Sequence, residues 1–558
     1  MKFIFAVLIL VCCYAVSSFA QWANPSPVRG QFGQMTTTKM SSIPNFVLPS
    51  IYSDRAAHPL PAVVNHETDA AAKAYMPPTS WSIDSWSCSN ASGVSFSYDY
   101  AVQTFNKITT ASVGKDPLFT FNYTYNFTYN PNAQDGYYYA GDGWNYVESF
   151  DILKATGGAT SSDFGGFMGA VEQTASWMSG YNKYYSAMKV RVDEYYKIDM
   201  AAAGADEMVK QIVYDNADGS PAGAILSLMA NSEEMPTTTV GGRGNTFTGL
   251  GGGGGHALSI CGYDNNFNGG CWQIQAHWGR GDYWLPYGML HSGSAWYNNP
   301  SPNKYAMFCR IKKNYTPKFT FKVNLAHSQR GQICIMVGAA NSTTATVPSV
   351  SKDFGNAFNY SGGTLPMCGG GKSSSIEIGF DLTDFASVVA AGQGTFFLRV
   401  LSKGGGTGKV DSLTLMDYNG SAVRAIRCSQ SNVAISSSTV LSVPWTGTVS
   451  TEIEKKTIAL HQGNGLLATY SPFSRSVQFS FPSGNARQAV LQIKDLSGRT
   501  VMAKNCSSIS SGNTATESWD MKNFFGQKVA RGTYIASVNI TNRNGTTRQL
   551  ATKVAVVD

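Results

Sequence analysis

Residues 87–105 read SCSNASGVSFSYDYAVQTF, and this stretch decides how the first half of the chain is organised. Apolar and aromatic residues recur from Val94 to Phe105 at helical spacing, which predicts a helix that begins at Cys88. A cysteine at the start of a helix lies at the positive end of the helix dipole, where the pKa of its thiol is lowered. Cys88 is therefore a candidate nucleophile. The competing interpretation is a buried structural cysteine or one half of a disulfide.

A histidine further along the chain is the second candidate for chemistry. His256 follows the glycine run 251–255 and opens the apolar strand Ala257–Cys261, and a nucleophilic cysteine needs such a base. The glycine run also matches the pattern of a dinucleotide-binding loop, but it precedes a strand instead of opening a helix, so we exclude nucleotide binding. Surface or core roles are expected for five of the other histidines, which are His58, His66, His291, His327 and His461.

A zinc site is an alternative use of the same region, because His256, Cys261, Cys271 and His277 are four ligands of the zinc type. Strand alternation separates His256 and Cys261 onto opposite faces, and an exported pair of cysteines flanking a turn more often oxidises. We therefore predict no metal and no cofactor. We also predict that Cys261 and Cys271 face one another on adjacent antiparallel strands, joined by the turn at 264–270.

Composition limits the class of protein. The 558 residues are 43% hydrophobic and only 14% charged, and 57 of them are glycine, which favours several β-rich domains with polar turns. The net charge of +7 is spread without a basic run or a basic amphipathic helix. Nucleic acid and membrane surfaces are therefore not expected partners.

The N-terminus has the pattern of a secretory signal peptide. Lys2 precedes an apolar stretch from Phe3 to Val16, and Ser18-Phe19-Ala20 matches a cleavage site before Gln21. No later stretch reaches the ~20 apolar residues that a membrane helix needs. We expect an exported protein, secreted or on the cell surface, in which residues 21–58 are an extended leader or short propeptide and folding starts near residue 60.

The rest of the chain changes character in stages. A mixed helix and strand region is followed by alternating apolar and polar residues, then by a Ser/Thr-rich stretch, then by alternation again. The expected fold class is multidomain, α+β and then all-β. The predicted segments are a signal peptide (1–20), a leader (21–58), a mixed domain (59–315), a β-sandwich (316–440), a linker (441–459) and a small second sandwich (460–558).

Three blocks in the mixed domain carry a resemblance to a known family. The blocks 87–94, 255–264 and 274–279 resemble those of papain-like cysteine peptidases, in the same order and spacing, and most closely a divergent secreted branch of the Bacteroidetes and Fibrobacter type. The resemblance implies a papain-like two-lobed fold. It also implies a cysteine-type endopeptidase, a hydrolase in which Cys88 is the nucleophile and His256 the general base, acting on a protein or peptide substrate. Supporting matches are Leu60-Pro61, Tyr75–Pro78, Trp177–Tyr181, Tyr184-Tyr185 and Leu285–Tyr287.

Two departures from the family pattern predict weakened activity. Residues 81–86 contain no glutamine to donate to the oxyanion, and Ala276 stands where the family has the asparagine that orients the histidine. Loss of an oxyanion donor costs about 10²–10³ in rate, and loss of the orienting residue up to about 10⁴ in serine enzymes. The alternative is a catalytically inactive papain-fold protein that acts as a binding or adhesion module on the cell surface. Short polar side chains that could substitute near the oxyanion are Ser82, Asp84 and Ser85.

The two β-rich segments also resemble known modules. Residues 316–440 resemble the sandwich that often follows such peptidases, through the segments 363–367 and 413–418. Residues 460–558 resemble the C-terminal sorting domain of the type IX secretion system, a small Ig-like sandwich, through 495–499, 519–520 and 526–534. This resemblance implies the type IX secretion apparatus as a partner. A third hypothesis makes the central sandwich a carbohydrate-binding element of a surface adhesin.

Overall fold

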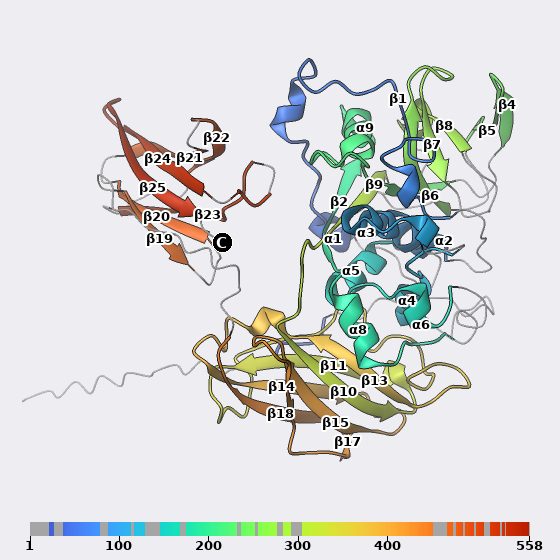
Figure 1. Ribbon diagram of the computed structural model, residues 1–558, viewed down its shortest axis with the longest axis vertical. Coiled ribbons are helices and arrows are strands. Elements are labelled where there is room, and N and C mark those ends of the chain that lie inside the picture. Colours follow the sequence, from blue (N-terminus) through green and yellow to red (C-terminus); the bar gives the residue numbers. More distant parts are fainter. Residues whose placement is uncertain are drawn as a thin grey trace, which may run out of the picture.

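In the part of the chain that the structure describes, the strands form five sheets that belong to three bodies (Figure 1). A mixed domain of helices on an antiparallel sheet is followed by a sandwich of two sheets and by a second, C-terminal sandwich, so the chain is multidomain and rich in β-sheet, as predicted. The computed structural model describes residues 22–26, 37–78, 87–112, 116–128, 146–167, 175–231, 236–250, 255–275, 283–291, 304–449, 466–471, 476–483, 486–495, 498–506, 514–524, 527–530 and 532–556.

The sheet of the mixed domain has nine strands among the described residues, in the order β2-β9-β3-β6-β7-β8-β5-β4, with β1 paired to β6. All of its pairings are antiparallel except that of β5 with β8. Its strands are β1 Val63–Asn65, β2 Val192–Asp199, β3 Leu226–Asn231, β4 Thr237–Val240, β5 Arg243–Phe247, β6 Gly255–Asp264, β7 Cys271–Gln275, β8 Tyr283–Pro286 and β9 Tyr305–Ile311.

The helix predicted to begin at Cys88 is confirmed. It runs as α2 (Cys88–Asn90), the wider π-helical turn η3 (Ala91–Tyr98) and α3 (Asp99–Asn106), and it ends at Lys107, whose backbone is left-handed with φ 58°. Every residue of η3 is buried. Serine hydroxyls in such a helix need partners, and Ser95 and Ser97 donate to the carbonyls of Phe119 (3.0 Å) and Ile225 (2.8 Å). The serines thus bind this helix to its surroundings.

Two cores lie on opposite sides of the sheet. The helix from Cys88 shares one core with alternate residues of β6, including Ala257 and Cys261. Helix α9 (Ala205–Asp215) covers the other face over Leu258 and Ile260. The remaining helices are α1 Thr37–Ser42, α4 Asn122–Thr128, α5 Tyr146–Thr156, α6 Ser161–Phe164, α8 Tyr181–Met188 and α10 Tyr287–His291, with 3-10 turns η1 Ser50–Ser53, η2 Lys73–Tyr75 and η4 Thr110–Ser112.

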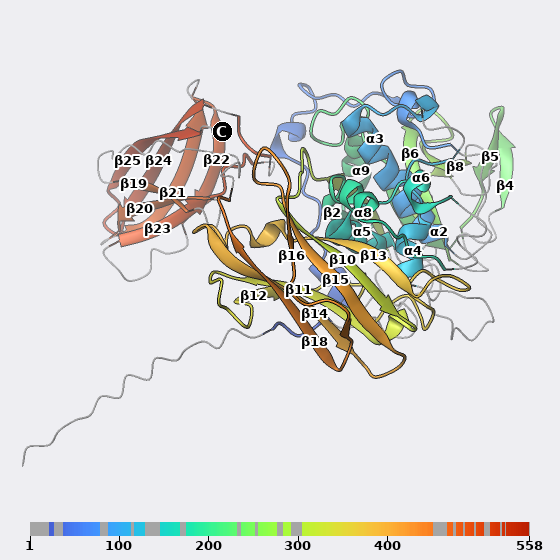
Figure 2. The same ribbon diagram turned by 60° about the horizontal axis from the view of Figure 1, so that its bottom comes forward.

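The central sandwich packs two sheets face to face (Figure 2). One sheet has the order β13-β10-β15-β16, with β17 on β15, and the other has the order β12-β11-β14-β18. The alternating stretches at 319–323, 376–380 and 396–400 form strands as predicted. The elements are β10 Phe319–His327, η6 Arg330–Gln332, β11 Ile333–Ala340, β12 Val350–Lys352, β13 Ser375–Asp381, η7 Thr383–Phe385, β14 Gln393–Ser402, β15 Gly408–Asp417, β16 Arg424–Arg427, β17 Val433–Ala434 and β18 Ser438–Thr446.

The expected linker at 441–459 begins inside this sandwich. Strand β18 pairs with the full length of β14, and its residues Leu441, Val443 and Trp445 are buried in the core. The Ser/Thr-rich composition concealed an ordinary alternation in which every second residue is apolar. Val449 is also part of the core, so the sandwich extends about ten residues beyond its predicted end.

The mixed domain and the sandwich share one hydrophobic core. Trp177 and Tyr184 of the mixed domain belong to the same cluster of buried side chains as the sandwich strands. The ring of Trp177 lies 5.2 Å from that of Phe358, and α8 packs against β13. These aromatic residues therefore form part of the contact between the two bodies.

The expected leader is packed against folded structure over much of its length. Met40, Ile43, Phe46 and Tyr52 are all buried in the cores of the mixed domain. The backbone of Phe46 donates to the carbonyl of Lys197 in β2 at 2.8 Å. Ordered packing therefore starts before residue 60, because the few apolar residues of this segment are spaced to fill the edge of the sheet rather than to form an amphipathic element.

The C-terminal body has a core of its own. Its two sheets have the orders β19-β20-β23 and β22-β21-β24-β25. The strands are β19 Leu467–Ser471, β20 Ser476–Pro482, β21 Ala486–Asp495, β22 Thr500–Asn505, β23 Thr514–Trp519, β24 Gly532–Asn542 and β25 Thr547–Val556. In the described part of the chain, no helix has both the length and the apolar character needed to cross a membrane.

Candidate functional site

Cys88 occupies the first position of α2, as the sequence predicted. The side chain is buried, with 8% of its surface exposed, and the first helical hydrogen bond runs from the N–H of Ala91 to the carbonyl of Ser87 at 2.9 Å. Asn90, two residues further along α2, accepts hydrogen bonds from Thr124 (3.1 Å) and Ser149 (2.6 Å). The start of this helix is therefore held by α4 and α5 in a fixed position.

His256 lies at the second residue of β6, directly after the glycine run. It pairs with Ala230 of β3, and 7% of its surface is exposed. Burial lowers the pKa of the imidazole from 6.5 to about 3. The ring is therefore neutral at pH 7, because removing it from water penalises the charged form.

The helix and β6 are in direct contact, and hydrogen bonds set their register. The hydroxyl of Ser92 donates to the carbonyl of Leu258 at 3.0 Å and lies 2.8 Å from the hydroxyl of Ser259. Cys88 is four residues before Ser92, about 6 Å back along a helix, and His256 is two residues before Leu258, about 6.6 Å back along a strand.

The direction of the helix follows from a second contact further along it. The hydroxyl of Ser97 donates to the carbonyl of Ile225. Ile225 directly precedes the residue of β3 that pairs with Ile260, so Ser97 lies beside a later part of β6 than Ser92 does. The helix therefore runs in the same direction as β6. Cys88 and His256 consequently lie at the same end of the contact between the helix and β6, although 167 residues of chain lie between positions 88 and 256.

Strand alternation determines toward which face of β6 the side chain of His256 points. Ala257, Ser259 and Cys261 face the helix, as their shared core and the bond to Ser92 show. His256 is one residue before this row, so it starts from the other face of the strand. A bond between Cys88 and His256 therefore requires the ring to turn around the end of β6.

Several candidate residues lie outside the described part of the chain. They are Ser82, Asp84, Ser85, Ala276 and His277.

The predicted facing pair of Cys261 and Cys271 is wrong in its register. The strands are adjacent, antiparallel and joined by the expected turn, but Cys271 is opposite Asp264. A bulge between Ile260 and Gly262 displaces Cys261, whose thiol lies 3.7 Å from the carbonyl of Gln273. The two cysteines belong to different cores and are not bonded to one another. The described residues hold no cluster of side chains suited to a metal ion.

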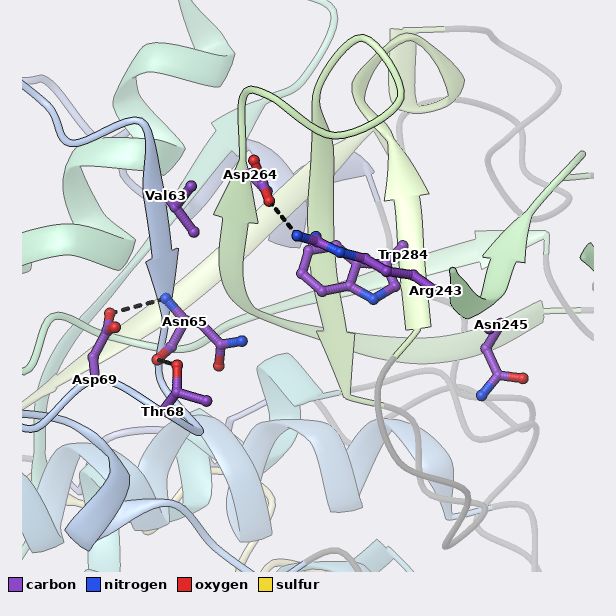
Figure 3. A pocket seen from close by; sticks show the side chains of 9 residues that line it. Val63, Asn65, Thr68, Asp69, Arg243, Asn245, Asp264 and Trp284 are labelled. Atoms are coloured by element: carbon purple, nitrogen blue, oxygen red, sulfur yellow. Dashed lines mark hydrogen bonds and ion pairs between the residues drawn. The ribbon is translucent and has the colours of Figure 1, made fainter. Parts of the chain in front are cut away.

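A cavity of about 460 Å³ opens at the other end of β6, far along the strand from His256 (Figure 3). Arg243 lies across it, with its guanidinium 4.3 Å from the ring of Trp284 and 4.4 Å from that of Phe267. The same guanidinium forms an ion pair with Asp264 at 2.7 Å. No local pattern in the sequence marks this cluster, because its members come from separate strands. The cavity is distinct from the Cys88 and His256 end of the strand.

Comparison with known proteins gives only weak similarities. No family model matches the chain, and no curated protein matches it. FlgD from P. aeruginosa is 17% identical over 16% of this chain and 74% of its own, with a TM-score of 0.14. The pullulanase SAP of Group B Streptococcus is 16% identical over 27% of this chain and 21% of its own, with a TM-score of 0.13. Dimeric latent PorU from Porphyromonas gingivalis is 11% identical over 60% of this chain and 30% of its own, with a TM-score of 0.15.

Proposed function

We propose that the mixed domain is a cysteine endopeptidase in which Cys88 is the nucleophile and His256 the general base. The observation that carries this proposal is the register of the helix from Cys88 on β6, which brings the helix start and the strand start to one place. Nucleophile and base must come from elements held this close. The family resemblance of the blocks around both residues supports the same assignment.

The chemistry follows from the two groups. The imidazole of His256 takes the proton of the Cys88 thiol, and the thiolate attacks the carbonyl carbon of the substrate. The imidazolium then gives this proton to the leaving amine, and water hydrolyses the acyl-enzyme. The N–H of Cys88, at the start of the helix, is one donor for the oxyanion.

The burial of His256 argues for a slow enzyme. With the pKa lowered to about 3, the ring is a poor base until an anion lies beside it. A thiolate at Cys88 would be such an anion, because an opposite charge favours the imidazolium. We therefore propose a weakened peptidase in which formation of the ion pair limits the rate.

Alkylation by an epoxide peptide warhead tests the proposal, because it requires an activated thiolate. We expect stoichiometric labelling at Cys88, located by peptide mass mapping, and loss of labelling in Cys88→Ser and His256→Ala. The matched controls are Cys368→Ser and Cys428→Ser, since these are the partly exposed cysteines of the described chain and would carry non-specific labelling. Labelling of the control cysteines with Cys88 untouched would refute the peptidase proposal.

A second candidate function is a catalytically inactive module for binding or adhesion. The observation that favours it is the burial of both groups, which leaves 8% of Cys88 and 7% of His256 exposed. An unreactive Cys88, together with no cleavage of a peptide library by the wild type or by Ala276→Asn, would favour this alternative.

We also propose that the protein is exported from the cell that makes it. The predicted signal peptide and the resemblance of the C-terminal body to a sorting domain support secretion or attachment at the cell surface through the type IX apparatus. Deletion of residues 460–558 should retain the protein in the periplasm of a host that has this system. Unchanged surface delivery of the deleted chain would refute the sorting role and leave the peptidase proposal standing.

A further inference from the structure

We propose that the outer face of the sheet β12-β11-β14-β18 is a peptide-binding site, and that residues 22–26 of this chain are its occupant. Residues 396, 398 and 400 of β14 point into the sandwich core. Alternation then turns Phe397 and Arg399 to the outer face. Met336 of β11 is the strand partner of Arg399, so it lies on the outer face as well.

This outer face is apolar and covered. Phe397 is 1% exposed and Met336 is fully buried, although both point away from the core. The ring of Trp22 meets that of Phe397 edge to face at 6.3 Å, and the guanidinium of Arg399 lies 5.4 Å from the centre of the Trp22 ring. Trp22 is thus held between an aromatic ring and a cation, an arrangement that selects an aromatic residue.

Polar contacts fix the other end of the segment. Asp353 accepts two hydrogen bonds from Ser26, one from its N–H at 2.5 Å and one from its hydroxyl at 2.9 Å. The amide of Asn359 donates to the carbonyl of Ser26 at 3.2 Å, and the N–H of Ala23 donates to the hydroxyl of Ser351 at 2.8 Å. Bonds to a carboxylate are the stronger kind. The ligand class is therefore an extended peptide with an aromatic residue four positions before a serine.

The segment connects two bodies. The chain that follows is anchored on the mixed domain, where the N–H of Lys197 donates to the carbonyl of Pro44 at 3.1 Å and Met40 is buried. Residues 22–26 are anchored on the sandwich. The N-terminal segment therefore acts as a clasp across the two bodies, and it begins directly after the predicted signal peptide.

A double-mutant cycle in the whole chain tests the contact. Asp353 also accepts a hydrogen bond from the N–H of Gly355, so a substitution of Asp353 alone disturbs more than the contact with Ser26. The informative quantity is therefore the coupling between the substitutions at Ser26 and Asp353 in the free energy of unfolding. We expect Ser26→Ala to raise the unfolding constant about tenfold, and no further effect of Ser26→Ala when Asp353→Ala, which removes both acceptor oxygens, is already present. The matched control pairs Ser26→Ala with Asp411→Ala, on the other sheet, whose effects should add.

Binding in trans separates a peptide site from a merely local contact. A chain that starts at residue 27 should bind a fluorescein-labelled peptide of residues 22–26 saturably, whereas the full chain should not, because its own segment fills the site. The peptide with Trp22→Ala should bind at least about tenfold more weakly, since it loses the ring that fills the site. Additive effects in the cycle, or a folded truncated chain that binds the peptide no better than the full chain, would overturn the proposal.

Discussion

Arg191 and Asp381 form a buried ion pair, 2.7 Å between Nη1 and Oδ2, that joins the mixed domain to the central sandwich. The two side chains are 9% and 2% exposed. Arg191 also donates to the carbonyl of Lys154 at 3.0 Å, and Tyr315 donates to the same carboxylate oxygen of Asp381. This cluster holds the segment after β9 against the end of β13, so the bodies are joined by polar contacts as well as by their common core.

Breaking this ion pair should destabilise both bodies together. Asp381→Asn leaves the buried guanidinium without its counter-charge, and such a loss costs about 3–5 kcal/mol. The free energy of unfolding from urea titration measures the change. The exposed pair Lys409 and Asp411 is the control, because Asp411→Asn should cost at most about 1 kcal/mol. Equal effects of the two variants would contradict the structural role of the Arg191 pair.

The mixed domain should not be soluble without the sandwich. A chain ending near residue 315 exposes Trp177, Tyr184 and their neighbours, which the sandwich otherwise covers. Aggregation or dye binding of this fragment measures the exposure. A chain ending at residue 449 is the control and should keep its melting temperature, since the C-terminal body has a separate core. A monomeric, cooperatively folded fragment 37–315 would contradict the shared core.

Arg330 should not tolerate replacement by lysine. Its guanidinium is fully buried, donates to the carbonyls of Gly362 and Ala175 at 2.6 Å each, and lies 4.5 Å from the Trp177 ring. Lysine lacks the planar fork that makes these bonds together, so Arg330→Lys should cost about 2–3 kcal/mol in chemical unfolding. Arg427→Lys, at an exposed position, should be neutral and serves as the control.

Stability should fall as the pH is lowered from 6.5 towards 4. Burial lowers the pKa of His66 to about 4 and that of His256 to about 3, so in this window the unfolded chain binds more protons than the folded one. The stabilisation is therefore present above pH 6.5 and lost below it. The melting temperature of His66→Gln should depend less on pH between 7 and 5 than that of the wild type. An unchanged slope would show that His66 is not buried in its neutral form.

Restoring an asparagine at position 276 should raise peptidase activity. The papain-like peptidases that these blocks resemble use an asparagine here to orient the imidazole of the proposed base, and Ala276 has no group that can do so. Ala276→Asn should increase kcat/KM on a peptide substrate, whereas the control Ala276→Val should not. Equal activities of the two variants would show that the residue at position 276 does not orient the imidazole of His256.

Periodicity along the chain was sufficient for the elements that carry the candidate site. The helix starting at Cys88 was predicted from apolar residues at helical spacing, and the strand carrying His256 from a short apolar run, and both patterns are local to their segments. The same holds for β10, β13 and β14, whose alternation predicted strands. The roles of Cys88 and His256 remain predictions from the family resemblance.

Other features were settled only by contacts between distant segments. The bulge that places Cys271 opposite Asp264 depends on how β6 lies against β7, and no pattern within either strand specifies it. The packing of Trp177 beside Phe358, and of Trp22 against Phe397, depends on surfaces that are distant in sequence. The sequence by itself determined which residues need burial and with what period. Only the tertiary structure decided which partner buries them, because apolar burial is non-directional and any complementary surface can satisfy it.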